Sequence, residues 1–111
     1  MRPVSTEEKT LFSKIIDREI PAEIVHEDEK CIVINDINPK AKVHLLVIPK
    51  KPIPTLFDLT PEDKDCMGHM MLLLPQLAQS QGLEGFKTQI NTGVTGGQEV
   101  FHIHVHLMGN K

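Results

Sequence analysis

The sequence lacks the features that mark several large classes of protein. Its longest apolar run, Met70–Leu74, is far shorter than the roughly 20 residues that cross a bilayer, and residues 1–10 lack the apolar core of a signal peptide. The longest run of basic residues is the pair Lys50-Lys51, which follows Pro49, and the formal net charge is -3. We therefore expect a cytoplasmic protein that binds neither membranes nor nucleic acid.

Cysteine is also scarce. Cys31 and Cys66 lie in apolar segments, and no CxxC spacing is present. This predicts two buried, reduced thiols rather than a disulfide or a redox centre. The chain contains no repeat, low-complexity tract or linker, so its 111 residues predict a single domain, residues 1–111, with residues 1–9 polar and mobile.

Apolar periodicity and helix-breaking residues predict the secondary structure. The pattern predicts helices over 10–21, ended by Pro21, and over 60–82, started by Thr60 and Pro61 and closed by Gly82; it predicts strands over 23–28, 30–36, 43–49, 86–91 and 99–108. Because helices and strands do not alternate regularly, the sequence predicts an α+β fold: a largely antiparallel five-stranded sheet with two helices.

The second predicted helix has two unusual features. Its Met-Met-Leu-Leu-Leu stretch, residues 70–74, makes the helix apolar over more than a single face. Such a helix either packs in a groove of its own sheet or faces a partner chain. Pro75 removes one helical hydrogen bond, and we expect a kink there.

Three histidines, His102, His104 and His106, alternate with apolar residues in "FHIHVHLM". In a strand, this spacing places all three imidazoles on one face. The row could be a polar strand face, a zinc site built on the HxH pairs, or a catalytic site with one imidazole as nucleophile or base. No second cluster of zinc ligands is evident, and the preceding loop "NTGVTGGQ" allows backbone N–H groups to approach an anion, although it lacks a Walker A ending. The catalytic interpretation is therefore favoured.

These segments resemble a known family. "NTGVTGGQEVFHIHVHLMG" resembles the histidine-triad (HIT) signature, and "LFSKIIDREIPAEIVHEDEKCIVINDINPKAKVHLLVIPKK" resembles the N-terminal half of its Hint branch, the purine nucleoside phosphoramidate hydrolases. The resemblance extends over about residues 10–109. It implies the HIT-like α+β fold, a homodimer whose sheets join, and cleavage of a purine nucleoside monophosphate from an amine, without cofactor or metal.

The resemblance also implies roles for individual residues. His104 would be the nucleophile that forms a covalent nucleotidyl-histidine, so its Nε2 must be free and its Nδ1–H needs an acceptor such as a main-chain carbonyl. His102 and His106 would stabilise the phosphate oxygens, and His44 matches a fourth active-site histidine. The nucleotide would be bound by Asp36 at the ribose, by Asn91, Gly97, Gln98, Glu99 and Val100 near the phosphate, and by Phe12, Ile15, Ile34, Ile37 and Leu46 around the base. His26 and His69 match no functional position, and we expect both at the surface.

Three departures from the family pattern bear on substrate preference. Ile34 replaces a frequent aromatic residue beside the base, Glu99 replaces the serine of eukaryotic members, and the chain ends two residues after Gly109. Glu99 is expected on the leaving-group side, where it favours amine-bearing substrates over anionic ones. Two alternatives to phosphoramidate hydrolysis remain: a dinucleoside polyphosphate hydrolase, and a nucleotide-binding interaction module with weak activity.

Overall fold

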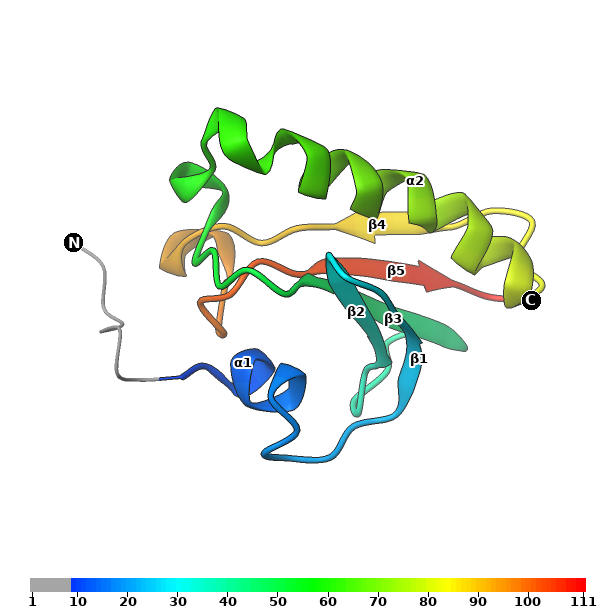
Figure 1. Cartoon of the computed structure of the whole chain (residues 1–111). Helices are drawn as coiled ribbons and strands as arrows, with labels where there is room; N and C mark the ends of the chain where they lie inside the picture. Colours follow the sequence, from blue (N-terminus) through cyan, green and yellow to red (C-terminus); the bar gives the residue numbers. More distant parts are fainter. Residues whose placement is uncertain (1–8) are drawn as a thin grey trace.

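The computed structural model describes residues 9–111, which form a five-stranded sheet flanked by two α-helices (Figure 1). In chain order the elements are α1 (Leu11–Ile16), β1 (Ile24–Glu27), β2 (Cys31–Asn35), β3 (Val43–Pro49), α2 (Lys64–Ser80), β4 (Lys87–Gln89) and β5 (Val105–Gly109). The strand order is β1-β2-β3-β5-β4, and every neighbouring pair is antiparallel. The predicted α+β class and antiparallel sheet are confirmed.

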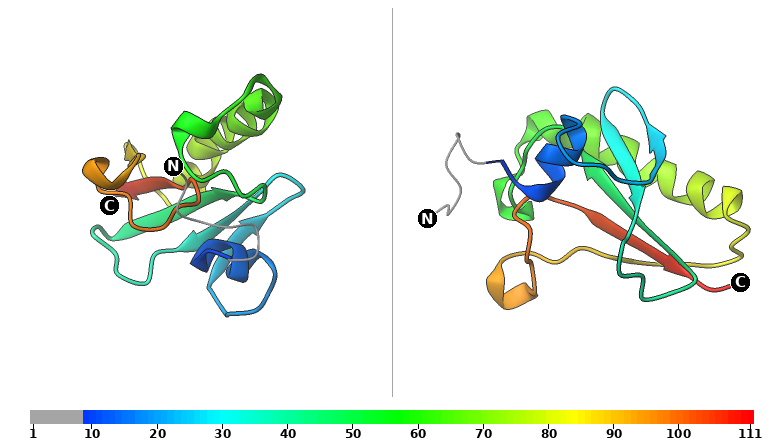
Figure 2. Two further views of the ribbon diagram at one scale, coloured as in Figure 1. Left: turned by 90° about the vertical axis from the view of Figure 1, so that its left-hand side faces the viewer. Right: turned by 90° about the horizontal axis from the view of Figure 1, so that it is seen from below.

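The two helices cover opposite faces of the sheet, as the two rotated views show (Figure 2). Side chains alternate along β3, so Val43, Leu45 and Val47 belong to the core beneath α2. Leu46 and Ile48 belong to a second core beneath α1. His44, between Val43 and Leu45 in sequence, therefore points to the α1 face.

Both helices differ from the predicted ranges at their ends. The side chain of Thr10 caps α1 by accepting the backbone N–H of Ser13, but the helix ends well before Pro21 because Arg18 has a left-handed φ of 66°. Thr60 and Asp63 cap a 3-10 turn at Pro61–Asp63, and α2 begins only at Lys64. Pro75 lies inside α2, which continues through it to Ser80.

The last strand is shorter than predicted. β5 begins at Val105, and residues 99–104 have no strand structure. The reason is tertiary: the backbone N–H of Ile103 donates to the carbonyl of Ile53 at 2.8 Å, outside the sheet. The prediction that His102 and His104 lie on a strand is therefore wrong. β4 likewise covers only Lys87–Gln89 of the predicted 86–91.

The predicted mobile segment, residues 1–9, lies outside the described residues except for Lys9, which forms ion pairs with Asp17 and Glu19. Both cysteines are free, as predicted; Cys31 is buried, but Cys66 is only partly buried, which differs from the prediction. Within residues 9–111, neither α-helix has the length and hydropathy that a membrane span requires.

Candidate active site

A cleft of about 800 Å³ opens on the α1 face of the sheet. It lies between α1, the segment after β2, the glycine-rich loop after β4 and the start of β5. Thirteen of the fifteen residues predicted for the site line it: Phe12, Ile15, Ile34, Asp36, Ile37, His44, Leu46, Asn91, Gly97, Glu99, Val100, His104 and His106. The structure thus brings most of the predicted site together, and places His102 and Gln98 outside the cleft lining.

His104 is held in one tautomer by the main chain. Its Nδ1 lies 2.9 Å from the carbonyl oxygen of His102. A carbonyl oxygen can only accept, so Nδ1 carries the proton and Nε2 carries the lone pair. The ring packs edge-on against Phe12, with centroids 4.8 Å apart. This arrangement provides the free Nε2 and main-chain acceptor expected from the sequence, on an imidazole that lines the cleft.

His44 and His106 form a second fixed pair in the cleft. The backbone N–H of Lys40 donates to His44 Nδ1 at 3.0 Å, so the ring proton of neutral His44 is on Nε2. That Nε2 lies 2.9 Å from Nδ1 of His106 and 3.4 Å from a carboxylate oxygen of Asp36. His44 therefore donates to His106 Nδ1, which leaves His106 with its proton on Nε2.

His102 occupies a different place from its two neighbours in the triad. It is fully buried, its Nε2 donates to the carbonyl of Pro49 at 2.7 Å, and its Nδ1 lies 3.3 Å from the hydroxyls of both Thr10 and Ser13. Both ring nitrogens are thus engaged within the protein. This geometry does not support the expected contact between His102 and substrate phosphate; the residue instead fixes the backbone whose carbonyl holds His104.

The environment keeps the triad imidazoles neutral. Burial lowers the pKa of His102 and of His104, although their hydrogen bonds to main-chain oxygens oppose this effect. Burial together with the nearby His104 and His44 rings lowers the pKa of His106 to about 4. Neutral imidazole is the form with a nucleophilic lone pair, so His104 is ready to attack at neutral pH.

The glycine-rich loop is shaped by two polar side chains. Buried Gln98 accepts the Gly93 N–H and donates to the carbonyls of Pro54 and Val100, so it braces the loop and does not face the cleft. Asn91 donates to the carbonyl of Gly96 at 2.8 Å. Gly97 has φ 87°, and a Cβ there would lie 3.2 Å from Asn91 Nδ2. The loop therefore requires glycine at position 97.

Two polar side chains of β4 are among the cleft residues that the sequence analysis missed. Lys87 and Gln89 on β4 line the cleft, and Gln89 pairs with His106 across β4 and β5. Their spacing in "FKTQIN" was the available signal, since residues two apart share one strand face. The hydroxyls of Thr10 and Ser13 were also missed, because their contact with His102 joins distant parts of the chain.

His26 and His69 were expected at the surface, and both are only partly exposed because they contact Asp28. Each side chain is only 34% exposed, and each Nε2 lies 2.7 Å from the same carboxylate oxygen of Asp28.

Within residues 9–111, two groups of side chains have the composition and proximity that could hold a metal ion: Asp36, His44 and His106 in the cleft, and Asp28, Cys31 and His69. In the cleft group, His44 Nε2 and His106 Nδ1 already form a hydrogen bond with each other.

Comparison with known proteins places these features in a family. The family model described as "Scavenger mRNA decapping enzyme C-term binding" matches residues 9–111. An uncharacterized HIT-like protein of Synechococcus elongatus is 50% identical over 105 residues, covering 94% of this chain and 92% of the relative. The purine nucleoside phosphoramidase of Escherichia coli is 42% identical over 106 residues, covering 94% and 89%.

Solved structures agree with the sequence relatives. The crystal structure of a HIT family hydrolase from Legionella pneumophila has a TM-score of 0.88 and 43% identity to this chain, and the match covers 91% of this chain and 92% of that one. The five-stranded antiparallel sheet with its two helices is thus the fold of that hydrolase. The chain belongs to the histidine-triad (HIT) family of hydrolases.

Proposed function

We propose that the protein is a nucleotidyl hydrolase that cleaves purine nucleoside 5′-phosphoramidates, such as AMP–amine conjugates, through a covalent intermediate on His104. One observation carries the proposal. His104 Nδ1–H donates to the His102 carbonyl, so the Nε2 of this cleft-lining residue has a free lone pair. The name of the E. coli relative, purine nucleoside phosphoramidase, supports the substrate class.

The reaction proceeds in two displacements. His104 Nε2 attacks the α-phosphorus, the P–N bond of the substrate breaks, and the leaving nitrogen keeps the electron pair and takes a proton from solvent. Water then attacks the nucleotidyl-histidine and returns one proton to solvent, which releases the nucleoside monophosphate and restores neutral His104. His106, with its proton on Nε2, donates a hydrogen bond to a phosphoryl oxygen or to the leaving nitrogen and keeps its proton. His44 and His102 are positioning residues, because each acts through another imidazole.

The remaining cleft residues bind the nucleoside. Asp36 accepts hydrogen bonds from the ribose hydroxyls, while its Oδ1 is held by the backbone N–H of Asn38 at 2.8 Å. Buried Phe12, Ile15 and Leu46 provide an apolar wall for the base. Burial lowers the pKa of His104, so its imidazole is a competent nucleophile on its own, and we expect the reaction to proceed without cofactor or metal.

The test compares the parent with His104→Ala on adenosine phosphoramidates, with and without chelator. We expect a loss of several orders of magnitude in kcat for the variant, unchanged parent activity in chelator, and AMP binding largely retained by the variant. Rapid quenching with labelled substrate should trap nucleotidylated parent protein and none of the variant. Variant activity within about tenfold of the parent would contradict the covalent mechanism. Faster cleavage of dinucleoside polyphosphates would instead favour the alternative substrate class.

A homodimer is part of the same proposal. On α2, Met71 is 41% exposed and Leu72 is 71% exposed, and apolar surface of this kind is commonly covered in a symmetric dimer. Analytical ultracentrifugation at micromolar concentration should give a mass near twice the 12.5 kDa of one chain. Leu72→Glu should shift the protein toward monomer. A parent that sediments only as monomer would contradict the dimer.

A further inference from the structure

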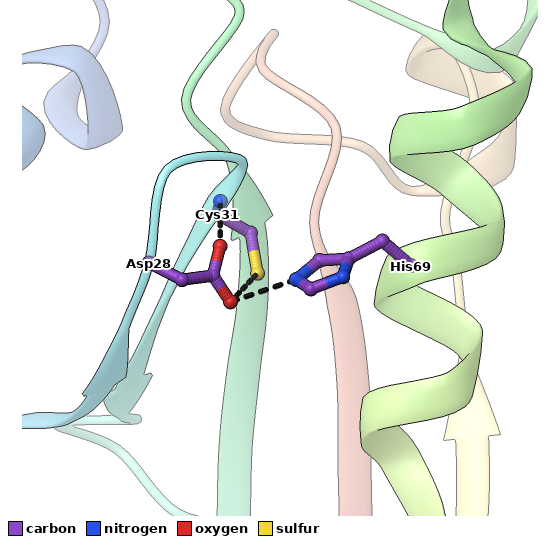
Figure 3. Close-up of side chains that lie close together, drawn as sticks. All are labelled: Asp28, Cys31 and His69. Atoms are coloured by element: carbon purple, nitrogen blue, oxygen red, sulfur yellow. Dashed lines mark hydrogen bonds and ion pairs between the residues drawn. The ribbon is translucent and has the colours of Figure 1, made fainter.

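A second cluster of chemically reactive side chains lies on the face of the sheet opposite the cleft. Asp28 is in the turn between β1 and β2, Cys31 is the first residue of β2, and His69 is on α2 (Figure 3). Cys31 belongs to the core beneath α2, whereas the cleft is on the α1 face. The cluster is therefore separate from the triad.

The carboxylate of Asp28 is held in a fixed orientation. Its Oδ1 accepts the backbone N–H groups of Lys30 at 2.8 Å and of Cys31 at 3.0 Å. Its Oδ2 is consequently turned toward Nε2 of His69, at 2.7 Å, and toward the thiol of Cys31, at 3.8 Å (Figure 3). One carboxylate oxygen, one imidazole nitrogen and one sulfur thus converge, all within 4.8 Å of one another.

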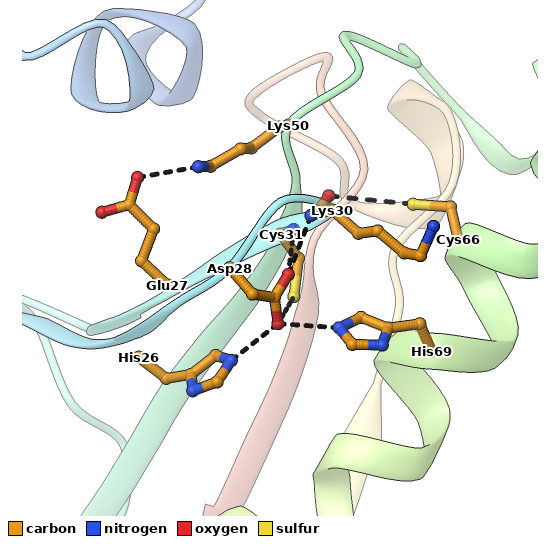
Figure 4. Close-up of polar contacts among 8 residues, drawn as sticks. All are labelled: His26, Glu27, Asp28, Lys30, Cys31, Lys50, Cys66 and His69. Atoms are coloured by element: carbon orange, nitrogen blue, oxygen red, sulfur yellow. Dashed lines mark hydrogen bonds and ion pairs between the residues drawn. The ribbon is translucent and has the colours of Figure 1, made fainter.

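His26 completes the surroundings from β1. Its Nε2 lies 2.7 Å from the same Oδ2 of Asp28, on the other side from α2 (Figure 4). Two imidazoles thus share one oxygen of Asp28, while two backbone N–H groups hold the other. An imidazole that donates to a ligating carboxylate is a common orienting partner in metal sites.

We propose that Asp28, Cys31 and His69 form a binding site for a zinc-type divalent cation, with His26 orienting the carboxylate. A mixed set of oxygen, nitrogen and sulfur donors suits zinc, whereas calcium and magnesium prefer oxygen alone. The side chains of Asp28 and His69 are 26% and 34% exposed, so solvent reaches the site and water fills the fourth position. Binding releases the thiol proton of Cys31 and leaves His69 protonated on Nδ1.

The distances fit this cation after a small adjustment. Two ligand atoms of a tetrahedral zinc lie about 3.4 Å apart for nitrogen and oxygen and about 3.6 Å apart for sulfur and oxygen. The observed 3.8 Å between Cys31 Sγ and Asp28 Oδ2 is already close. The 2.7 Å between His69 Nε2 and Asp28 Oδ2 must widen. A movement of the partly exposed His69 ring by less than about 1 Å is enough.

The consequence of binding is structural. The cation would connect the β1–β2 turn to α2, two parts of the fold that are 41 residues apart at Asp28 and His69. A ligand that binds only the folded state raises its stability. The site lies apart from the proposed chemistry, so chelation should lower the melting temperature without lowering phosphoramidate hydrolysis.

The test uses the full chain stripped with chelator and then titrated with zinc or cobalt(II) alone. We expect one equivalent per chain, a rise in Tm with zinc, and cobalt spectra with intense tetrahedral bands and thiolate-to-cobalt charge transfer. Cys31→Ser should abolish the charge-transfer band. The matched control is Cys66→Ser, because Cys66 Sγ lies 3.9 Å from the Lys30 carbonyl beside the site but is not a proposed ligand; the band should persist.

Two further variants make the result decisive even if Cys31→Ser folds poorly. His69→Gln, at a partly exposed position, should lose the bound equivalent while its circular dichroism stays that of the parent. Asp36→Asn, which alters the cleft group, should retain the equivalent. Zinc binding that survives in His69→Gln, or that is lost in Asp36→Asn, would overturn the proposal, as would a parent that binds no stoichiometric zinc or cobalt.

Discussion

His44 Nε2 lies 2.9 Å from Nδ1 of His106, and this contact sets which nitrogen of His106 is protonated. The Lys40 N–H fixes His44 in turn, so a main-chain donor determines the proton positions of two imidazoles. The relay ends at His106 Nε2–H in the cleft. A strand residue that looks unremarkable in "KVHLLVIP" therefore controls a donor beside the proposed nucleophile.

We predict that His44→Ala lowers kcat by at least about tenfold, because His106 would then populate both tautomers; a wrong tautomer can cost up to about 10⁴-fold at a catalytic imidazole. His44→Gln should recover part of this loss, since the glutamine amide can donate from nearly the same position. The measurement is steady-state hydrolysis of adenosine phosphoramidate, with kcat and KM separated. Equal kcat for the two variants would show that the donor at this position has no role.

The glycine-rich loop permits a matched pair of substitutions. Gly97→Ala should destabilise the loop by about 1–2 kcal/mol, because φ is 87° and the added Cβ meets Asn91 Nδ2 at 3.2 Å. Gly96→Ala is the control, since an added Cβ there meets nothing within 4 Å. Urea unfolding and kcat/KM should both fall for Gly97→Ala and stay near the parent for Gly96→Ala. Similar behaviour of the two variants would contradict the role given to position 97.

Acidification should destabilise the fold through the triad. The unfolded chain protonates histidine near its ordinary pKa of 6.5, whereas the pKa of folded His106 is about 4, because burial disfavours the cation. Between these values the unfolded state binds more protons, so stability is present above about pH 6.5 and is lost as the pH falls toward 4. Burial lowers the pKa of His102 and His104 in the same direction.

Urea unfolding of the parent and of His106→Gln over this pH range tests the assignment. The parent should lose stability more steeply on acidification than the variant, which lacks one of the groups that gain a proton on unfolding. The difference between the two curves isolates His106 from the carboxylates that also titrate at low pH. Parallel curves would show that His106 is not held neutral by the fold.

The sheet could be predicted from the sequence because alternation and chain breaks are local signals. The cleft residues were predicted through the family resemblance. Alternation adds only that His44 and Leu46 share one face of β3, and Phe12 and Ile15 share the buried side of α1. The position of His102 could not be predicted. In sequence, His102 continues the strand pattern of His104 and His106. In the structure, the Ile103 N–H bonds to the distant Ile53 carbonyl, and the His102 ring bonds to the distant Pro49 carbonyl, so this segment does not join the sheet.

The Asp28 cluster was also outside the reach of sequence reasoning. His26 is on β1 and Asp28 is in the charged turn after it, and such turns usually face solvent. The contact with His69 depends on how α2 lies over the sheet, which no local pattern specifies. Family resemblance directed attention to the triad and left these side chains without a role.

Glu99 is the residue near the chemistry that departs from the family pattern. It is exposed and lines the cleft next to the loop. A carboxylate about 5 Å from a phosphate charge costs roughly 3 kcal/mol at an effective dielectric near 20, so the side chain is best accommodated on the leaving-group side. There it would attract a cationic leaving group and repel an anionic one.

We predict that Glu99→Ser narrows the preference for cationic over anionic leaving groups. The measurement is the ratio of kcat/KM for an AMP conjugate of a diamine to that for an AMP conjugate of an amino acid. Glu99→Gln is the matched control, since it keeps the size of the side chain and removes only the charge, and it should narrow the ratio as much as Glu99→Ser does. Raising the salt concentration should narrow the ratio in the parent and leave the variants nearly unchanged, because screening weakens exposed charges. If the ratio is the same in the parent and both variants, the Glu99 carboxylate lies in solvent and does not select substrates.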